Sequence, residues 1–300
     1  MSDSATQSGF DLRHRAEGLA AGLPPLLAAA EHLAAALQQG LHGRRRAGQG
    51  TEFWQYRAAQ PGDEARRIDW RRSARSDAQF LREQEWQAAQ SVQVWADNAA
   101  SMSYRSSDRW EDKGDRARLL ALALAVLLER GGERIGLADG MAPPRAGRAQ
   151  LMRMAEALSL RDEGADYGAP RAAALLPGAR AVFLSDFLGG FDPVRDAVLA
   201  AADKGVKGAL VQILDPAEEE FPFAGRALFE SMGAALRHET KEAAGLRGRY
   251  LARLAERRDQ LADLGRSAGW AVTMHRTNSP AQGALLWLYQ VIGPNQGLQR

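Results

Sequence analysis

Strand-like and helix-like segments alternate along the chain from Val92 to the C-terminus. The strand-like segments are short runs rich in β-branched or aromatic residues, whereas the helix-like ones repeat apolar residues at helical spacing. The expected strands are 92–96, 133–137, 181–184, 206–214 and 271–275, and the expected helices are 115–130, 150–160, 193–204, 239–269 and 281–291. This alternation is typical of a parallel sheet covered by helices on both faces, so the sequence predicts an α/β fold.

Three of the expected strands end in a carboxylate. Asp97 follows the first strand, Asp186 follows the strand that begins at Ala181, and Asp215 follows the strand that begins at Val206. Ligands of open α/β sheets gather at the carboxyl ends of the strands. We therefore expect a functional site at this edge, although nothing in the sequence names a substrate.

The first 40 residues are expected to form an N-terminal tail and helices, broken at Pro24 and Pro25. The most apolar stretch, Leu26–Leu37, contains Glu31 and His32 and is too short to cross a bilayer. The polar, serine-rich start has no apolar signal region, and the chain has no cysteine, which fits a reducing compartment. These features predict a cytoplasmic protein without a transmembrane segment.

Residues 41–90 differ from the rest of the chain in their dense mixture of aromatic and charged residues. Because charges of both signs nearly balance there, internal ion pairing explains them better than a nucleic-acid surface does. We expect Asp69 and one or more of Arg57, Arg72 and Arg75 to pair as structural latches. The tryptophans of this region, Trp70 among them, are expected to pack in a core, with an exposed stacking platform as the less favoured alternative.

This segment begins with a glycine-punctuated loop that contains three consecutive arginines, Arg44–Arg46. It lacks the glycine-lysine-serine/threonine ending of a P-loop, so nucleotide binding is not supported. The net charge of the chain is only +2, and the simplest interpretation is a solvated loop. Nucleic-acid binding through the arginine-rich segment 44–75 stays open as an alternative.

Several ordered motifs of this segment resemble the signature of domain-of-unknown-function family fifty-eight. They are Gly48-Gln49-Gly50-Thr51-Glu52-Phe53, Tyr56-Arg57, Pro61-Gly62-Asp63, Arg67-Ile68-Asp69-Trp70 and Ser73-Ala74-Arg75. The resemblance implies structural roles for Arg57, Asp63, Asp69, Trp70, Arg72 and Arg75. It also implies a β-rich subdomain at 41–90, followed by a von Willebrand factor A-like, Rossmann-like sandwich at 91–300.

Domains of the von Willebrand factor A type bind a divalent ion through an Asp-x-Ser-x-Ser motif, a threonine and a later aspartate. In this chain Asp97, Ser101 and Asp186 match, but Ala99 replaces the middle serine, and the loop 137–150 has no threonine. The resemblance thus implies a degenerate metal site, with Mg²⁺ as the only cofactor to consider. Arginines near the sheet edge are the expected replacement for the ion.

The family resemblance also implies a partner, a MoxR-type AAA+ ATPase, in the maturation or assembly of a protein complex. We expect a non-enzymatic interaction adaptor, whose partner-binding face comprises Asp97, Ser101, Ser103, Arg145, Arg148 and Asp186. The five histidines show no metal spacing, and no glycine-x-serine-x-glycine elbow supports a hydrolase. A magnesium-dependent enzyme is the remaining alternative.

Overall fold

The computed structural model describes residues 25–42, 53–59, 68–74, 79–84, 89–160, 165–230 and 237–293. The chain divides into two compact units, one formed by Met1–Gly40 with Gln90–Arg300 and the other by Leu41–Ala89. None of the helices within the described ranges is long and apolar enough to cross a membrane.

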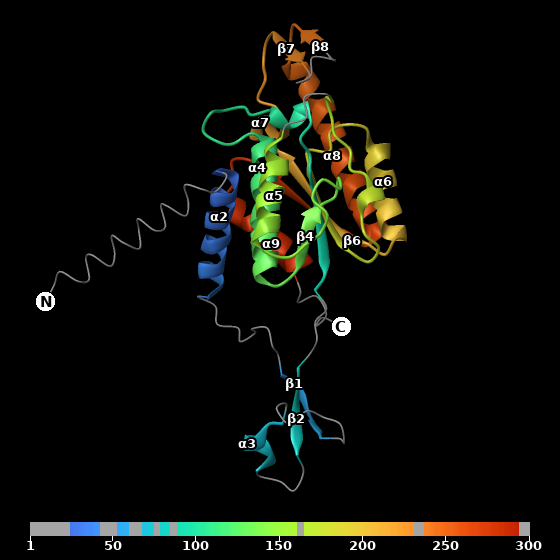
Figure 1. The fold of residues 1–300 in the computed structure, drawn as a ribbon. Helices are drawn as coiled ribbons and strands as arrows, with labels where there is room; N and C mark the ends of the chain where they lie inside the picture. The colour runs from blue at the N-terminus through green and yellow to red at the C-terminus, as the bar shows by residue number, and fades with distance from the viewer. Residues whose placement is uncertain are drawn as a thin grey trace, which may run out of the picture. The chain divides into compact units, whose positions relative to one another are not determined.

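The larger unit is built on a sheet of five parallel strands in the order β4-β3-β5-β6-β9 (Figure 1). The strands are β3 (Ser91–Ala96), β4 (Arg134–Leu137), β5 (Arg180–Ser185), β6 (Lys207–Leu214) and β9 (Ala271–Arg276). The mixed α/β architecture with a parallel central sheet agrees with the prediction from alternating segments.

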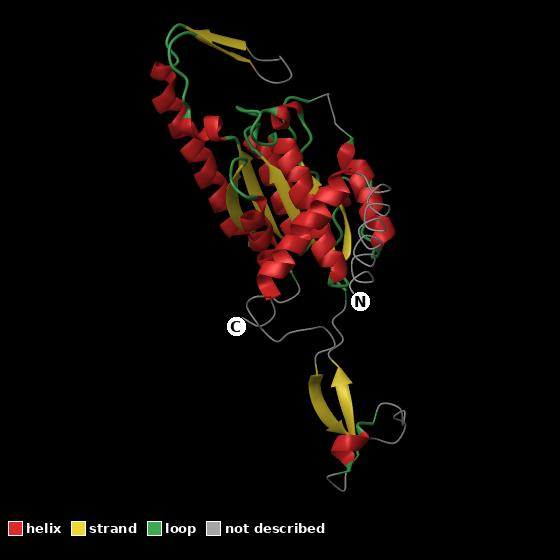
Figure 2. Cartoon of the chain, turned by 90° about the vertical axis from the view of Figure 1, so that its left-hand side faces the viewer, coloured by secondary structure: helices red, strands yellow, loops and turns green. Residues whose placement is uncertain are grey.

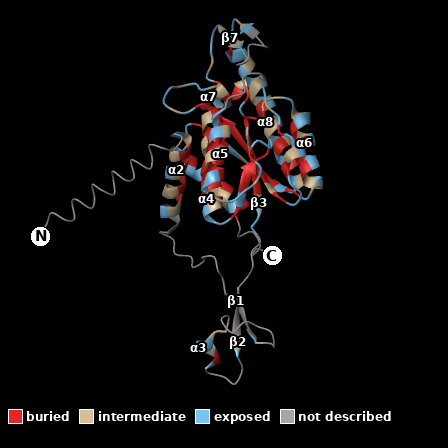
Figure 3. Ribbon diagram, viewed as in Figure 1, coloured by how far each residue is buried: buried red, intermediate tan, exposed pale blue. Residues whose placement is uncertain are grey.

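Helices cover both faces of this sheet (Figure 2), because successive side chains of each buried strand point to opposite faces. In β5, Val182 and Leu184 join one apolar cluster, whereas Ala181 and Phe183 join the other. The first cluster includes residues of α2 (Pro25–His42), α4 (Lys113–Arg130), α5 (Arg148–Ser159) and α9 (Ala281–Ile292). The second includes residues of α6 (Phe191–Asp203) and α8 (Ala244–Ala268). Figure 3 shows the buried residues concentrated on the sheet and on the inner sides of these helices.

The chain reverses direction after β4 and does not pass directly into a crossover helix. Ile135 and Arg145 exchange backbone hydrogen bonds of 3.0 Å, so the segment before α5 runs antiparallel to β4. A Cβ on Gly136 would lie 2.5 Å from the carbonyl oxygen of Ala142, so only glycine permits this close return. The reversal carries the start of α5 towards the amino end of β4.

A second antiparallel hairpin, β7 (Ala227–Glu230) and β8 (Arg237–Thr240), precedes α8. The expected helix 239–269 therefore begins later, at Ala244, because 239–240 pair with β7 instead. Between β6 and this hairpin lies the short helix α7 (Pro216–Glu220). Two 3-10 turns complete the unit, η2 (Ala100–Ser103) and η3 (Ala172–Ala174).

The smaller unit contains an antiparallel pair, β1 (Phe53–Ala58) and β2 (Phe80–Gln84), and the one-turn helix α3 (Trp70–Ser73). Asp69 is fixed through its backbone, since its N–H donates to Phe80 at 2.9 Å and its carbonyl accepts from Ser73 Oγ at 2.8 Å. Trp70 is 58% exposed, so the expectation that it packs in a core is wrong. The expected contacts of Arg44–Arg46, Asp63 and Arg75, and of the side chains of Arg57 and Arg72, lie outside the described residues.

Candidate functional site

The three carboxylates that end strands meet at one edge of the sheet, because β3, β5 and β6 are parallel neighbours. They are nevertheless sealed, with Asp97 and Asp186 each 1% exposed. A partner protein resting on this surface cannot touch the Asp97 carboxylate, so the expectation that Asp97 belongs to an exposed docking face is wrong. The groups that cover these carboxylates therefore determine which side chains are exposed at this edge.

Lys113, the first residue of α4, supplies the positive charge at this edge. Its Nζ lies 2.8 Å from Asp186 Oδ2 and 2.5 Å from Glu218 Oε1, and the residue is 1% exposed. Burial alone would lower the pKa of Lys113, but the carboxylates of Asp186 and Glu218 outweigh it and raise this pKa. The ammonium group is therefore charged at every physiological pH.

Local capping fixes Lys113 and one of its two partners, Glu218. Asp112 caps α4 by accepting from the backbone N–H of Asp115 at 2.6 Å, which sets the start of the helix at Lys113. Glu218 belongs to a capping box of α7, in which its carboxylate accepts from the N–H of Asp215 at 2.9 Å. Burial raises the pKa of Glu218 despite the nearby ammonium group.

Asp97 is held by a different set of bonds. Its carboxylate accepts from Ser185 Oγ at 2.6 Å and from the backbone N–H of Ala99 at 3.0 Å. Burial raises its pKa, and the nearby carboxylate of Asp186 adds to that effect. Gly168 lies directly against this carboxylate, so closely that any Cβ at that position would clash with it.

These residues do not fit a magnesium site. Lys113 places an ammonium group against Asp186, and the oxygens of Asp97 are bonded to Ser185 and Ala99 and covered by Gly168. In the part of the chain that the structure describes, no group of three or more histidines and acidic residues could hold a metal ion. We expected an arginine to pair with these carboxylates in place of the ion, but the residue that pairs with Asp186 is Lys113.

The arginines predicted for the partner-binding face lie elsewhere. Arg145 pairs with Ile135, which is level with Val92 near the start of β3, because the chain doubles back after β4. Arg148 begins α5, and its Nη2 lies 3.5 Å from Oε1 of Glu31 in α2. The loop that approaches Ser101 is instead 165–168: Ala165 and Asp166 accept from the N–H groups of Ala100 and Ser101, each at 2.9 Å. Ser103 ends η2 and is partly buried.

A pocket of about 230 Å³ opens beside the Lys113 ammonium group. Six aromatic rings line it: Tyr104, Tyr167, Phe221, Phe223, Phe229 and Tyr250. We call this cavity the ring pocket; Ser101, Lys113, Asp186 and Glu218 also line it. Phe221 contacts Phe223, Phe229 and Tyr250 with centroid distances of 4.9–5.6 Å, so the wall is a packed aromatic cluster.

The sequence pattern does not predict the ring pocket, because nothing in it assigns a role to 216–238 and it favours a helix over 239–250. The signal was present in the three phenylalanines at 221, 223 and 229, since the stretch they enclose contains Pro222 and Gly225, which are unsuited to a helix. Burial raises the pKa of Tyr167 and Tyr250, and the negative charges of Asp186 and Glu218 add to the shift, so both phenols stay protonated.

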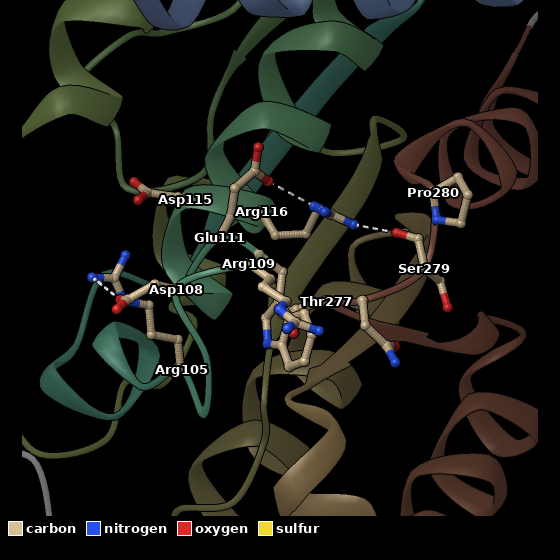
Figure 4. Close-up of a pocket in the computed structure, with 11 residues that line it drawn as sticks. Arg105, Asp108, Arg109, Glu111, Asp115, Arg116, Thr277, Ser279 and Pro280 are labelled. Atoms are coloured by element: carbon tan, nitrogen blue, oxygen red, sulfur yellow. Dashed lines mark hydrogen bonds and ion pairs between the residues drawn. The ribbon is translucent and has the colours of Figure 1, made fainter.

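A second buried cation, Arg116, lies one turn further along α4 (Figure 4). It donates to Glu111 at 2.8 Å, to the carbonyl of Ser279 at 2.7 Å and to His275 Nε2 at 2.7 Å. Because a guanidinium group can only donate, Nε2 of His275 must be the unprotonated nitrogen. Burial and the charge of Arg116 lower the pKa of His275 to about 4, so this imidazole is neutral.

Comparison with known proteins gives a family and distant relatives. The family described as "Protein of unknown function DUF58" matches residues 55–260, which is more than half of the chain. Uncharacterized proteins of Mycobacterium bovis and Mycobacterium tuberculosis are 28% identical over 247 residues, covering 77% of this chain and 76% of theirs. No solved structure matches the chain.

Proposed function

The chain belongs to the DUF58 family of proteins of unknown function, and from that premise we propose that it is a non-enzymatic interaction adaptor. In this proposal the larger unit is a von Willebrand factor A-like domain that works with a MoxR-type AAA+ ATPase in maturing or assembling a protein complex. The partner docks at the carboxyl edge of the sheet, at the mouth of the ring pocket.

The position of Lys113 carries this proposal. A catalytic edge would need carboxylates free to hold a metal ion, or a nucleophile with a base within hydrogen-bond reach. Here the Lys113 ammonium group pairs with Asp186 and Glu218, and the Ser101 hydroxyl of the lining has no hydrogen-bond partner among the described residues that could act as its base. Most of the remaining lining of the ring pocket is aromatic. Aromatic side chains around a buried polar floor are typical of the anchor sites of protein interfaces.

Binding measurements between the purified chain and the MoxR-type ATPase test this proposal. Tyr167→Ala removes a ring that is 39% exposed in the ring pocket, and we expect it to weaken binding by about tenfold or more, as truncation of an interface anchor does. Leu199→Ala is the matched control, since Leu199 is also 39% exposed but lies on α6, outside the ring pocket. Absence of binding, or equal loss in both variants, would contradict the proposed docking site.

A further inference from the structure

We propose that the ring pocket binds one cationic side chain, an arginine or a lysine, of a partner protein. The role of the partner rests on the proposed function, whereas the preference of the ring pocket for a cation follows from its own residues. Three observations support that preference: the balance of charge in the floor, the arrangement of the rings, and an unused hydrogen-bond acceptor.

The floor of the ring pocket carries more negative than positive charge. One ammonium group, that of Lys113, faces two carboxylates, those of Asp186 and Glu218. Burial of an unbalanced carboxylate is unfavourable, which is visible in the raised pKa of Glu218. A second cation near the floor would balance the charge, whereas an anionic group would add to the imbalance.

The rings provide the surface that an organic cation needs. The faces of aromatic rings carry negative charge and attract ammonium and guanidinium groups within about 6 Å of the ring centre. The protein already contains this interaction in the ring pocket, where Lys113 Nζ lies 5.7 Å from the centre of the Tyr104 ring. Phe223, Phe229 and Tyr250 lie in the same lining, and among the described residues no cation lies over their rings.

Ser101 supplies an unused polar group. It is only 8% exposed, it lines the ring pocket, and its Oγ has no hydrogen-bond partner in the described structure. A buried hydroxyl without a partner is unfavourable, and a guanidinium or ammonium group can only donate. An N–H of the incoming cation would satisfy this hydroxyl, which an apolar side chain could not do.

The test uses the full-length chain and three capped pentapeptides, Gly-Gly-X-Gly-Gly, where X is arginine, citrulline or glutamate. Citrulline has nearly the shape of arginine but no charge. We expect the arginine peptide to bind about fivefold to thirtyfold more tightly than the citrulline peptide, the range that cation–π contacts support, and the glutamate peptide not to bind. Titrations followed by NMR chemical shifts of the aromatic side chains give both affinity and location.

Two variants assign the effect to the ring pocket. Phe229→Leu keeps an apolar side chain but removes a ring, and Ser101→Ala removes the acceptor; each should weaken arginine-peptide binding by about fivefold. Leu199→Ala should bind like the original chain. Should Phe229→Leu not fold, Tyr167→Leu replaces it, because Tyr167 is 39% exposed and its ring lines the ring pocket.

Equal binding of the arginine and citrulline peptides, binding of the glutamate peptide, or no binding at all would overturn the inference. These outcomes are separate from those of the proposed function, because no ATPase is present in this experiment. Conversely, Tyr167→Ala could abolish ATPase binding while Phe229→Leu and Ser101→Ala leave it unchanged. That result would support the adaptor function but contradict the binding of a cationic side chain at the docking site.

Discussion

The first turn of α4 carries two buried cationic side chains, those of Lys113 and Arg116, and their surroundings differ in charge. Lys113 lies between two carboxylates, Asp186 and Glu218, whereas Arg116 contacts one half-exposed carboxylate, a neutral imidazole and a carbonyl. The first cation pairs with Asp186, which the family resemblance would assign to a metal ion. The second joins the start of α4 to β9 and to the turn before α9. One turn of helix thus carries the cation of the ring-pocket floor and, beside it, a cation whose contacts depend on a neutral histidine.

The largest effect should come from Lys113→Met. Removing this ammonium group leaves Asp186 and Glu218 buried without a counter-charge, which we expect to lower the free energy of unfolding by about 3–5 kcal/mol. Urea unfolding followed by circular dichroism measures the loss. The triple variant Lys113→Met, Asp186→Asn, Glu218→Gln should recover most of it, because no unpaired charge then remains. A loss below about 1 kcal/mol would mean that the pair is solvated, as surface pairs are.

The contact between Arg116 and His275 should instead make the free energy of unfolding depend on pH. The pKa of His275 is about 4 in the folded chain and about 6.5 when unfolded, so the unfolded chain binds more protons between these values. The contribution of His275 to the free energy of unfolding is complete above pH 6.5. It declines as the pH falls towards 4, by about 3 kcal/mol in all.

His275→Gln isolates this term, because glutamine can accept from Arg116 but does not titrate. The difference between the unfolding free energies of variant and original chain should change by about 3 kcal/mol between pH 7 and pH 4. Taking the difference cancels the opposite trend expected from Asp97 and Glu218, whose raised pKa values favour the folded state as the pH falls. A difference that does not vary with pH would contradict the neutral imidazole.

A smaller effect should come from Gly168→Ala, which tests how tightly loop 165–168 covers Asp97. The added methyl group would clash with the Asp97 carboxylate, and overpacking of this kind costs about 1–3 kcal/mol. Gly248→Ala in α8 is the control, since nothing lies within 4 Å of its Cβ, and it should stabilise the chain by up to about 1 kcal/mol. Equal effects of the two substitutions would show that Asp97 is not covered.

Sequence periodicity predicted much of the sheet, and parallel topology then brought Asp97, Asp186 and Asp215 to one edge. Periodicity did not predict which cation pairs with these carboxylates, because a lysine before a helix usually lies in solvent. Lys113 is instead buried against Asp186 at the end of β5 and against Glu218, which α7 brings to it. Arg145 was misplaced for a similar reason, since the reversal after β4 depends on the absence of a side chain at Gly136. Local pattern fixes strands and helices, whereas these two positions depend on contacts between distant segments.

A magnesium titration of the unfolding free energy tests the central claim, that Lys113 takes the place of a metal ion, most directly. A bound ion at 100 times its dissociation constant would add about 2.7 kcal/mol to the free energy of unfolding. We predict no saturable increase at any magnesium concentration, because the ammonium group already pairs with the Asp186 and Glu218 oxygens that an ion would need. A saturable increase that disappears in Asp97→Ala would contradict the account.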